Sequence, residues 1–192
     1  GIRTILFFKG CPLRCRWCSN PFGLAARPQL AVNREKCTGC GMCEKVCSHG
    51  VNTVVPGERV TVNFSACVQC GACVTLCAAK TRMIAGKAYT AQQLYREAAK
   101  DAAFYRKGGG GVTLSGGEVL LQHEVAAETL RLCRANYINT CIETSAFAPW
   151  EQLWAVARHC NTVFVDLKAM DSGKHKELTG VPNERILQNI EK

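Results

Sequence analysis

Apolar runs of strand length recur along the chain and predict four β-strands. They cover residues 2–8, 112–114, 139–144 and 162–167. Between the later runs, apolar positions recur every three or four residues, a spacing typical of helices. The first of these helices begins at Thr90, where Gln93 completes a capping box, and ends at the glycine run 108–111. A second covers residues 122–135, and a third begins at Pro149.

Strands that alternate with helices predict a parallel sheet with right-handed crossovers, and therefore an α/β fold. In such a sheet the carboxyl ends of the strands share one edge, and functional side chains gather beyond it. At the ends of the four predicted strands, or just past them, lie four unusual motifs, at residues 11–18, 115–118, 143–144 and 166–168. We therefore expect these motifs to meet in one site. Because the chain starts inside a strand and stops inside a helix, we also expect a piece of a longer protein.

Residues 34–82 interrupt this pattern with a short, cysteine-dense segment. Its two halves repeat the spacing Cys-x2-Cys-x2-Cys-x3-Cys, beginning at Cys37 and at Cys67, so the repeat has a period of thirty residues. We interpret the segment as an inserted domain whose core is built around metal. The expected organisation is therefore a first strand and cysteine loop over 1–33, the insert over 34–82, and the remainder of the α/β domain over 83–192.

Fourteen of the 192 residues are cysteines, which narrows the chemistry. A disulfide scaffold would be a small secreted domain, and we see neither a secretory signal pattern nor an apolar run of membrane-spanning length. Eleven of the cysteines fall in three tight groups, as metal or cluster ligation requires. The net charge of +9 counts thiols as neutral, and cluster ligation would lower it to roughly +4. The basic residues are scattered, so no nucleic acid or membrane partner is expected.

The first cysteine group, Cys11-x3-Cys15-x2-Cys18, places three thiolates on one tight loop. Three cysteines can hold three irons of a cubane cluster and leave the fourth iron open. The open iron can chelate a ligand through an amine and a carboxylate. The alternative is a zinc site in which a distant residue such as His49 completes three cysteines.

The run over residues 10–20, Gly-Cys-Pro-Leu-Arg-Cys-Arg-Trp-Cys-Ser-Asn, resembles the signature of radical S-adenosylmethionine (SAM) enzymes. The flanking residues 2–4 and 20–21 narrow the resemblance to the activating enzymes of glycyl radical enzymes. This resemblance covers nearly the whole chain. It implies a partial (β/α) barrel, usually of six units, of which this chain carries four strands.

The same resemblance implies roles for the motifs at the strand ends. Cys11, Cys15 and Cys18 would hold a [4Fe–4S] cluster for reductive cleavage of SAM. The SAM-binding residues would be Asn20, Ser115, Gly116, Gly117, Glu118, Glu143, Thr144, Asp166 and Lys168. The glycine pair lets the backbone approach the methionine amino group closely, and the acidic pair would shape a site for a monovalent cation. The plain alternatives are an ordinary turn and a solvated ion pair.

The repeated segment resembles the two-cluster bacterial ferredoxins, a small α+β fold. In that fold the fourth cysteine of each run serves the other cluster. The implied sets are Cys37, Cys40, Cys43 and Cys77 for one [4Fe–4S] cluster, and Cys67, Cys70, Cys73 and Cys47 for the second. The alternative is a pair of zinc knuckles. The two auxiliary clusters could relay electrons, stabilise the fold or dock an electron donor. The lone Cys133, Cys141 and Cys160 are expected to be small buried hydrophobes.

The resemblance implies an activating enzyme that cleaves SAM to methionine and a 5′-deoxyadenosyl radical. The radical would abstract hydrogen from a backbone glycine of a partner glycyl radical enzyme. An electron donor such as flavodoxin or ferredoxin and an oxygen-free cytoplasm follow from this chemistry. Two alternatives stay open: a radical SAM enzyme with a different substrate, and a pure electron-transfer protein. The latter would leave residues 11–18 and 115–118 without a purpose.

Overall fold

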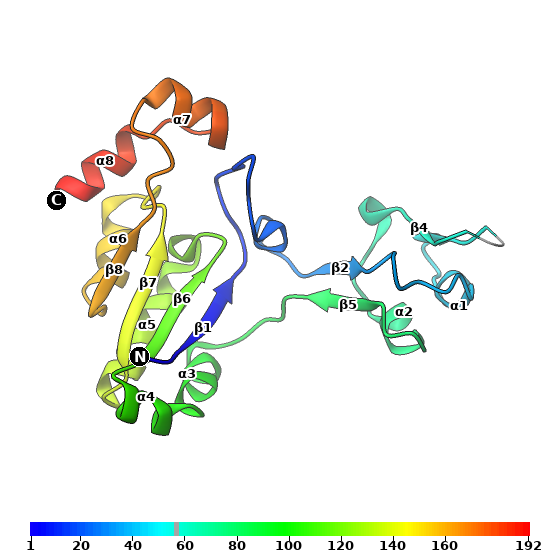
Figure 1. The fold of residues 1–192 in the computed structure, drawn as a ribbon, viewed down its shortest axis with the longest axis horizontal. Helices are drawn as coiled ribbons and strands as arrows, with labels where there is room; N and C mark the ends of the chain where they lie inside the picture. The colour runs from blue at the N-terminus through cyan, green and yellow to red at the C-terminus, as the bar shows by residue number, and fades with distance from the viewer. Residues whose placement is uncertain (56–57) are drawn as a thin grey trace. The chain divides into compact units, whose positions relative to one another are not determined.

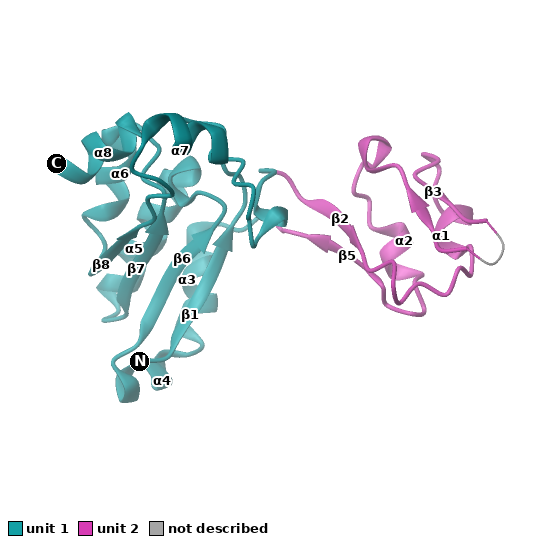
Figure 2. Cartoon of the chain, turned by 45° about the horizontal axis from the view of Figure 1, so that its top comes forward, with its two compact units in different colours: residues 1–26, 88–192 teal, residues 27–87 magenta. Residues whose placement is uncertain are grey.

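The computed structural model describes residues 1–55 and 58–192, which form two compact units. One unit consists of Gly1–Ala26 and Ala88–Lys192, and the other of Arg27–Lys87 (Figure 2). The second unit contains the predicted insert 34–82, whose residues 56–57 lie outside the described part, and extends it at both ends. Pairing explains the extension, because β2 (Gln29–Val32) and β5 (Arg82–Ala85) form an antiparallel ladder.

The larger unit is built on a sheet of four parallel strands in the order β1-β6-β7-β8 (Figure 1). The strands are β1 (Arg3–Phe8), β6 (Gly111–Gly116), β7 (Asn139–Thr144) and β8 (Thr162–Val165). The predicted parallel α/β arrangement is confirmed. Because neighbouring strands run the same way, their carboxyl ends share one edge.

Four helices lie between consecutive strands and pack on one face of the sheet (Figure 1). They are α3 (Ala91–Ala99), α4 (Ala102–Gly108), α5 (His123–Ala135) and α6 (Trp150–Ala157). The 3₁₀ turns η1 (Pro21–Gly23) and η3 (Val119–Gln122) follow β1 and β6, and α7 (Ser172–Thr179) and α8 (Glu184–Glu191) follow β8. On the covered face, Val112, Leu114 and Ile142 are fully buried. On the opposite face, Phe7 and Phe164 are exposed.

The predicted helix that begins at Thr90 is in fact two helices, α3 and α4. The capping box is present, since Gln93 N donates to Thr90 Oγ1 at 3.2 Å and Thr90 N donates to Gln93 Oε1 at 2.8 Å. Asp101 leaves helical geometry, with φ −98° and ψ 10°. Its carboxylate accepts a 2.5 Å hydrogen bond from the Thr4 hydroxyl on β1. The prediction of one continuous helix from helical spacing was therefore wrong, and the break between the two helices coincides with this tertiary contact.

The fourth strand is shorter than the predicted 162–167, because β8 ends at Val165. Asp166 N still donates to Thr144 O at 2.9 Å, and the chain then leaves the sheet. Asp166 and Lys168 therefore lie beyond the strand rather than within it.

The smaller unit repeats one short motif around each cysteine run. It contains β3 (Asn52–Thr53), β4 (Thr61–Val62), α1 (Met42–Lys45), α2 (Ala72–Thr75) and the 3₁₀ turn η2 (Phe64–Ala66). Each short helix starts from a left-handed glycine, Gly41 at φ 75° and Gly71 at φ 81°. The small apolar core of this unit consists of Leu30, Cys43, Val51, Val60 and Val62.

Among the described residues of either unit, no helix combines the length and apolar character that crossing a membrane requires.

Candidate active site and iron–sulfur centres

A cavity of about 370 Å³ opens at the carboxyl ends of the parallel strands. Its lining includes every site residue predicted for the larger unit, namely Cys11, Cys15, Cys18, Asn20, Ser115, Gly116, Gly117, Glu118, Glu143, Thr144, Asp166 and Lys168. These residues lie at the carboxyl ends of the four strands or in the segments that follow them, so the parallel pairing is what brings them together. The volume lies in the range of sites for small molecules and cofactors.

Backbone hydrogen bonds hold the cysteine loop at both ends. At its base, Gly10 N donates to Gly23 O at 2.8 Å, and Glu118 N donates to Gly10 O at 2.6 Å. Near its tip, Arg14 N donates to Thr179 O, at the end of α7, at 2.6 Å. The loop is therefore fastened to two elements from distant parts of the sequence, which fixes where its three thiols lie.

Two consecutive glycines, the last residue of β6 and the one after it, bring that strand end against the cysteine loop. Gly116 has φ +114°, and a Cβ there would lie 2.4 Å from Phe8 O. A Cβ on Gly117 would lie 2.2 Å from Gly10 O and 2.5 Å from Gly23 O. Any side chain at these positions would collide with backbone, so the close approach requires glycine. This packing leaves the cavity wall at 115–118 made largely of backbone.

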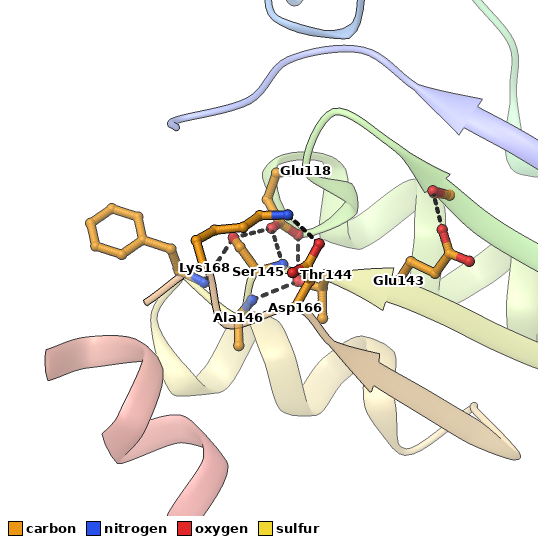
Figure 3. Close-up of polar contacts among 9 residues, drawn as sticks. Glu118, Glu143, Thr144, Ser145, Ala146, Asp166 and Lys168 are labelled. Carbon is orange, nitrogen blue, oxygen red and sulfur yellow. Dashed lines mark hydrogen bonds and ion pairs between the residues drawn. The ribbon is translucent and has the colours of Figure 1, made fainter. Parts of the chain in front are cut away.

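Glu118 is the buried centre of the polar network (Figure 3). Its Oε1 accepts hydrogen bonds from Leu120 N at 3.1 Å and Thr144 Oγ1 at 2.6 Å. Its Oε2 accepts from Ser145 N at 2.9 Å and Ser145 Oγ at 2.5 Å. Both carboxylate oxygens are thus occupied by the protein itself. Glu118 positions the end of β7, and direct contact of its carboxylate with a cofactor stays a prediction.

The two other acidic residues of the cavity have separate partners. Ser115 Oγ donates to Glu143 at 2.6 Å, and Lys168 Nζ forms an ion pair with Asp166 (Figure 3).

The cysteine thiols of the cavity are affected by burial. Burial raises the pKa of the Cys15 thiol, whereas the Lys168 ammonium lowers it. Burial also raises the pKa of Cys11. A bound cationic group would favour the thiolate form of these cysteines, and its binding would release protons.

The smaller unit contains two cavities, each lined by four cysteines. One is lined by Cys37, Cys40, Cys43 and Cys77, and the other by Cys67, Cys70, Cys73 and Cys47. Each cavity therefore takes its fourth cysteine from the other run. Within residues 1–55 and 58–192, no three His, Cys, Asp or Glu side chains converge on a point suited to one metal ion. A hollow lined by four thiols suits a cubane cluster, which is larger than a single ion.

Hydrogen-bond donors surround several of these sulfur atoms. Thr81 places its hydroxyl 3.3 Å and its N–H 3.4 Å from Cys77 Sγ. The Thr81 hydroxyl lowers the pKa of Cys77, and the backbone N–H groups of Val60 and Gly39 lower that of Cys37. Such donors stabilise thiolate, the form in which cysteine binds iron. The hydrogen-bond donors around these sulfur atoms therefore suit cysteines that bind iron as thiolates.

The family comparison agrees with this geometry. Residues 64–192 match the family model described as the radical SAM superfamily. This chain belongs to the radical SAM superfamily. Residues 36–81 match the model described as a 4Fe-4S dicluster domain, which confirms the ferredoxin-like character predicted for the insert. The predicted fold class, a radical SAM α/β domain with such an insert, is likewise confirmed.

Relatives of this radical SAM chain are named as activating enzymes. The chain is 43% identical over 192 residues to the choline trimethylamine-lyase activating enzyme of Oleidesulfovibrio alaskensis, covering 99% of this chain and 62% of that protein. It is 42% identical to the trans-4-hydroxy-L-proline dehydratase activating enzyme of Clostridioides difficile, over 99% of this chain and 63% of that protein. It is 38% identical to the (2S)-3-sulfopropanediol dehydratase activating enzyme of Klebsiella oxytoca, over 99% of this chain and 61% of that protein. The chain spans a little over three-fifths of these relatives.

A solved structure also shares sequence with this radical SAM chain. It is a domain of a pyruvate-formate lyase-activating enzyme from Bacteroides vulgatus, 42% identical over 42% of this chain and 50% of that one. Its TM-score of 0.40 is too low to show a common fold.

The radical SAM cavity also has lining residues that sequence patterns did not predict. They are Leu13, Trp17, Ser19, Gly23, Leu24 and Ser145. Ser145 follows Thr144 at the end of β7, so extending the strand-end rule by one residue would have found it. Leu13 is the buried apolar residue of the cysteine loop. Its position between two cysteines is only a weak sequence signal for a cavity-lining residue.

The three lone cysteines of this chain are buried or partly buried. Cys133 belongs to the apolar core, Cys160 is partly buried against the same core, and Cys141 is buried elsewhere in the sheet. Burial raises the pKa of Cys133 to about 11 and that of Cys160 to about 12. These thiols are therefore protonated at neutral pH and serve as small apolar side chains, as expected.

Proposed function

We propose that this protein is a glycyl-radical-enzyme activating enzyme. The observation that carries the proposal is one cavity that unites three loop cysteines with the strand-end motifs. The names of the relatives support the same activity. Cys11, Cys15 and Cys18 would hold a [4Fe–4S] cluster, which would supply the electron for reductive cleavage of SAM and so allow a hydrogen atom to be taken from a glycine of the partner.

In this proposal the protein's own residues position the cofactor and need not act as acids or bases, because the reaction transfers a hydrogen atom. Gly116 and Gly117 present backbone to the methionine amino group, and Thr144 and Asn20 line the same cavity. The Lys168 ammonium group binds the cofactor's carboxylate or ribose. Glu118 acts through Thr144 and Ser145, whose placement depends on its carboxylate.

The remaining assignments belong to the same proposal. Two auxiliary [4Fe–4S] clusters occupy the cysteine-lined cavities of the smaller unit, and a monovalent cation binds near Glu143 and Asp166. The partner is a glycyl radical enzyme of the lyase and dehydratase kind for which the relatives are named. The electron donor is a flavodoxin or ferredoxin, and the protein works in an oxygen-free cytoplasm.

The release of 5′-deoxyadenosine tests the central step. The full-length protein is reconstituted with iron and sulfide without air, reduced and given SAM. We expect product from the parent and from Cys160→Ala, a lone core cysteine, and none from Cys15→Ala. Parent protein with intact clusters but no product would overturn the proposal and favour electron transfer alone.

The crossed ligation of the auxiliary clusters can be tested by comparing two four-cysteine variants. One replaces Cys37, Cys40, Cys43 and Cys77 by alanine, the set that lines one cavity. The control replaces the contiguous run, Cys37, Cys40, Cys43 and Cys47. We expect the first variant to lose about four irons per chain and the control to lose up to about eight, because the control takes ligands from both clusters. Iron analysis decides, and the reverse order would contradict the crossed assignment.

A further inference from the structure

The two halves of the cysteine repeat meet at a pair of equivalent positions that carry different side chains. Asn52 and Arg82 each lie five residues after the last cysteine of their run, thirty residues apart. Asn52 opens β3 and Arg82 opens β5. Arg82 Nη1 donates a hydrogen bond to Asn52 Oδ1 at 2.8 Å. The repeat thus departs from its own symmetry here, by placing a cation on one side only.

The same guanidinium reaches a cysteine of each run. Arg82 Nη2 donates to Cys43 Sγ at 3.1 Å, and Nη1 lies 3.7 Å from Cys73 Sγ. These cysteines are the third of their runs and line different cavities. Arg82 also lines the first cavity, while Asn52 lines the second. One side chain therefore bridges the two proposed cluster sites.

Arg82 is a buried and permanent charge. Its side chain and that of Asn52 are both buried, with Arg82 only 6% exposed. Guanidinium stays protonated across the working pH range of proteins, and a buried charge is costly unless an anion compensates it. The ion pairs found among the described residues join other side chains. Besides Asn52, Arg82 reaches the sulfurs of Cys43 and Cys73, so its burial is compensated when these sulfurs ligate a cluster as thiolates.

We propose that Arg82 is a redox-tuning residue that raises the reduction potentials of both auxiliary clusters through hydrogen bonds to Cys43 and Cys73. This inference rests on the proposed binding of two clusters. A reduced cluster carries one more negative charge than an oxidised one, so a fixed cation beside it stabilises the reduced form. Hydrogen bonds to ligand sulfurs and net charge are known determinants of cluster potential. The shared position makes both clusters respond to one side chain.

The test measures the midpoint potentials of the auxiliary clusters. The full-length protein carries alanine at Cys11, Cys15 and Cys18, so that signals come from the smaller unit alone. Arg82→Gln is compared with Arg34→Gln, which removes one charge from an exposed position of the same unit. Anaerobic titrations followed by electron paramagnetic resonance give the potentials, and iron analysis confirms about eight irons per chain.

We expect Arg82→Gln to lower both potentials by at least about 59 mV, a tenfold shift in a one-electron equilibrium. Arg34→Gln should leave both unchanged, and Arg82→Lys should lower them less than Arg82→Gln because it keeps the charge. Fully loaded Arg82→Gln with the potentials of Arg34→Gln would overturn the inference. A parent protein that binds no iron in this unit would instead overturn the cluster assignment on which the inference rests.

A second measurement covers the case in which Arg82→Gln loses its clusters. Parent protein labelled with ¹⁵N-arginine is reduced, and the coupling of nitrogen to each cluster spin is measured by pulsed electron paramagnetic resonance. We expect a ¹⁵N coupling to both clusters that disappears in Arg82→Lys. Clusters without any ¹⁵N coupling would overturn the inference without recourse to a glutamine variant.

Discussion

Gly117→Ala is expected to lower the rate of 5′-deoxyadenosine formation by the reconstituted full-length protein by at least about a hundredfold. The added Cβ would lie 2.2 Å from Gly10 O and 2.5 Å from Gly23 O, and both oxygens belong to backbone at the base of the cysteine loop. Backbone cannot rotate away as a side chain can, so the loop and the β6 end must separate. A displacement of about 1 Å in a catalytic geometry can cost a hundredfold in rate.

A matched glycine in the same unit provides the control. Gly173 lies in α7, where an added Cβ meets only the Asp171 side chain, at 3.4 Å. Gly173→Ala should keep the parent rate within about twofold, since surface substitutions of this kind change stability little. Iron content is measured for both variants, which separates loss of the cluster from misplacement of SAM. Parental activity in Gly117→Ala would contradict the close approach on which the site is built.

Glu118→Gln is expected to lower the free energy of unfolding by about 2 to 4 kcal/mol, although it keeps the shape of the side chain. Each carboxylate oxygen accepts one backbone N–H, from Leu120 on one side and Ser145 on the other. Glutamine has only one oxygen, so whichever way its amide turns, the NH₂ group faces a backbone N–H. Hydroxyls can rotate to compensate, whereas those two N–H groups cannot. Glu118 is only 1% exposed, so bulk water has little access to these two groups.

Urea unfolding followed by tryptophan fluorescence measures this effect, because all three tryptophans belong to the larger unit. Glu124→Gln, on the exposed side of α5, is the control and should change stability by less than about 0.5 kcal/mol. Glu118→Ala should be at least as destabilising as Glu118→Gln, since it removes both acceptors. If Glu118→Gln matched Glu124→Gln in stability, the carboxylate would not organise the β7 end as described.

Much of the fold followed from local patterns. The apolar runs placed the strands of the parallel sheet, and the edge rule placed their motifs in one cavity. Local patterns failed where a contact from far along the chain intervened. The helix after Thr90 breaks at Asp101 because Thr4, on the first strand, bonds its carboxylate. Helical spacing contains no information about that partner, since it registers only neighbours within a turn or two.

Within the candidate site, the sequence indicated which residues gather but not what each one contacts. Glu118 belongs to a motif associated with cofactor binding, yet its oxygens bind Thr144 and Ser145, more than twenty-five residues away. The position of Glu118 directly after the glycine pair does not indicate these long-range hydrogen bonds. The missed cavity residues, such as Ser145, show the same limit, because lining a cavity depends on which strands become neighbours.

The sequence by itself indicated the chemistry of this protein: the spacing within each cysteine run shows which three thiols lie close together, and the place of each motif at the end of its strand assigns it to the carboxyl edge of the sheet. Both are properties of residues close together in the chain, where geometry is set by a few dihedral angles. Only the tertiary structure decided that Arg82 bridges Cys43 and Cys73, across 39 and 9 residues of separation, and that Glu118 faces inward. Those contacts arise from packing between distant segments, which no local period encodes.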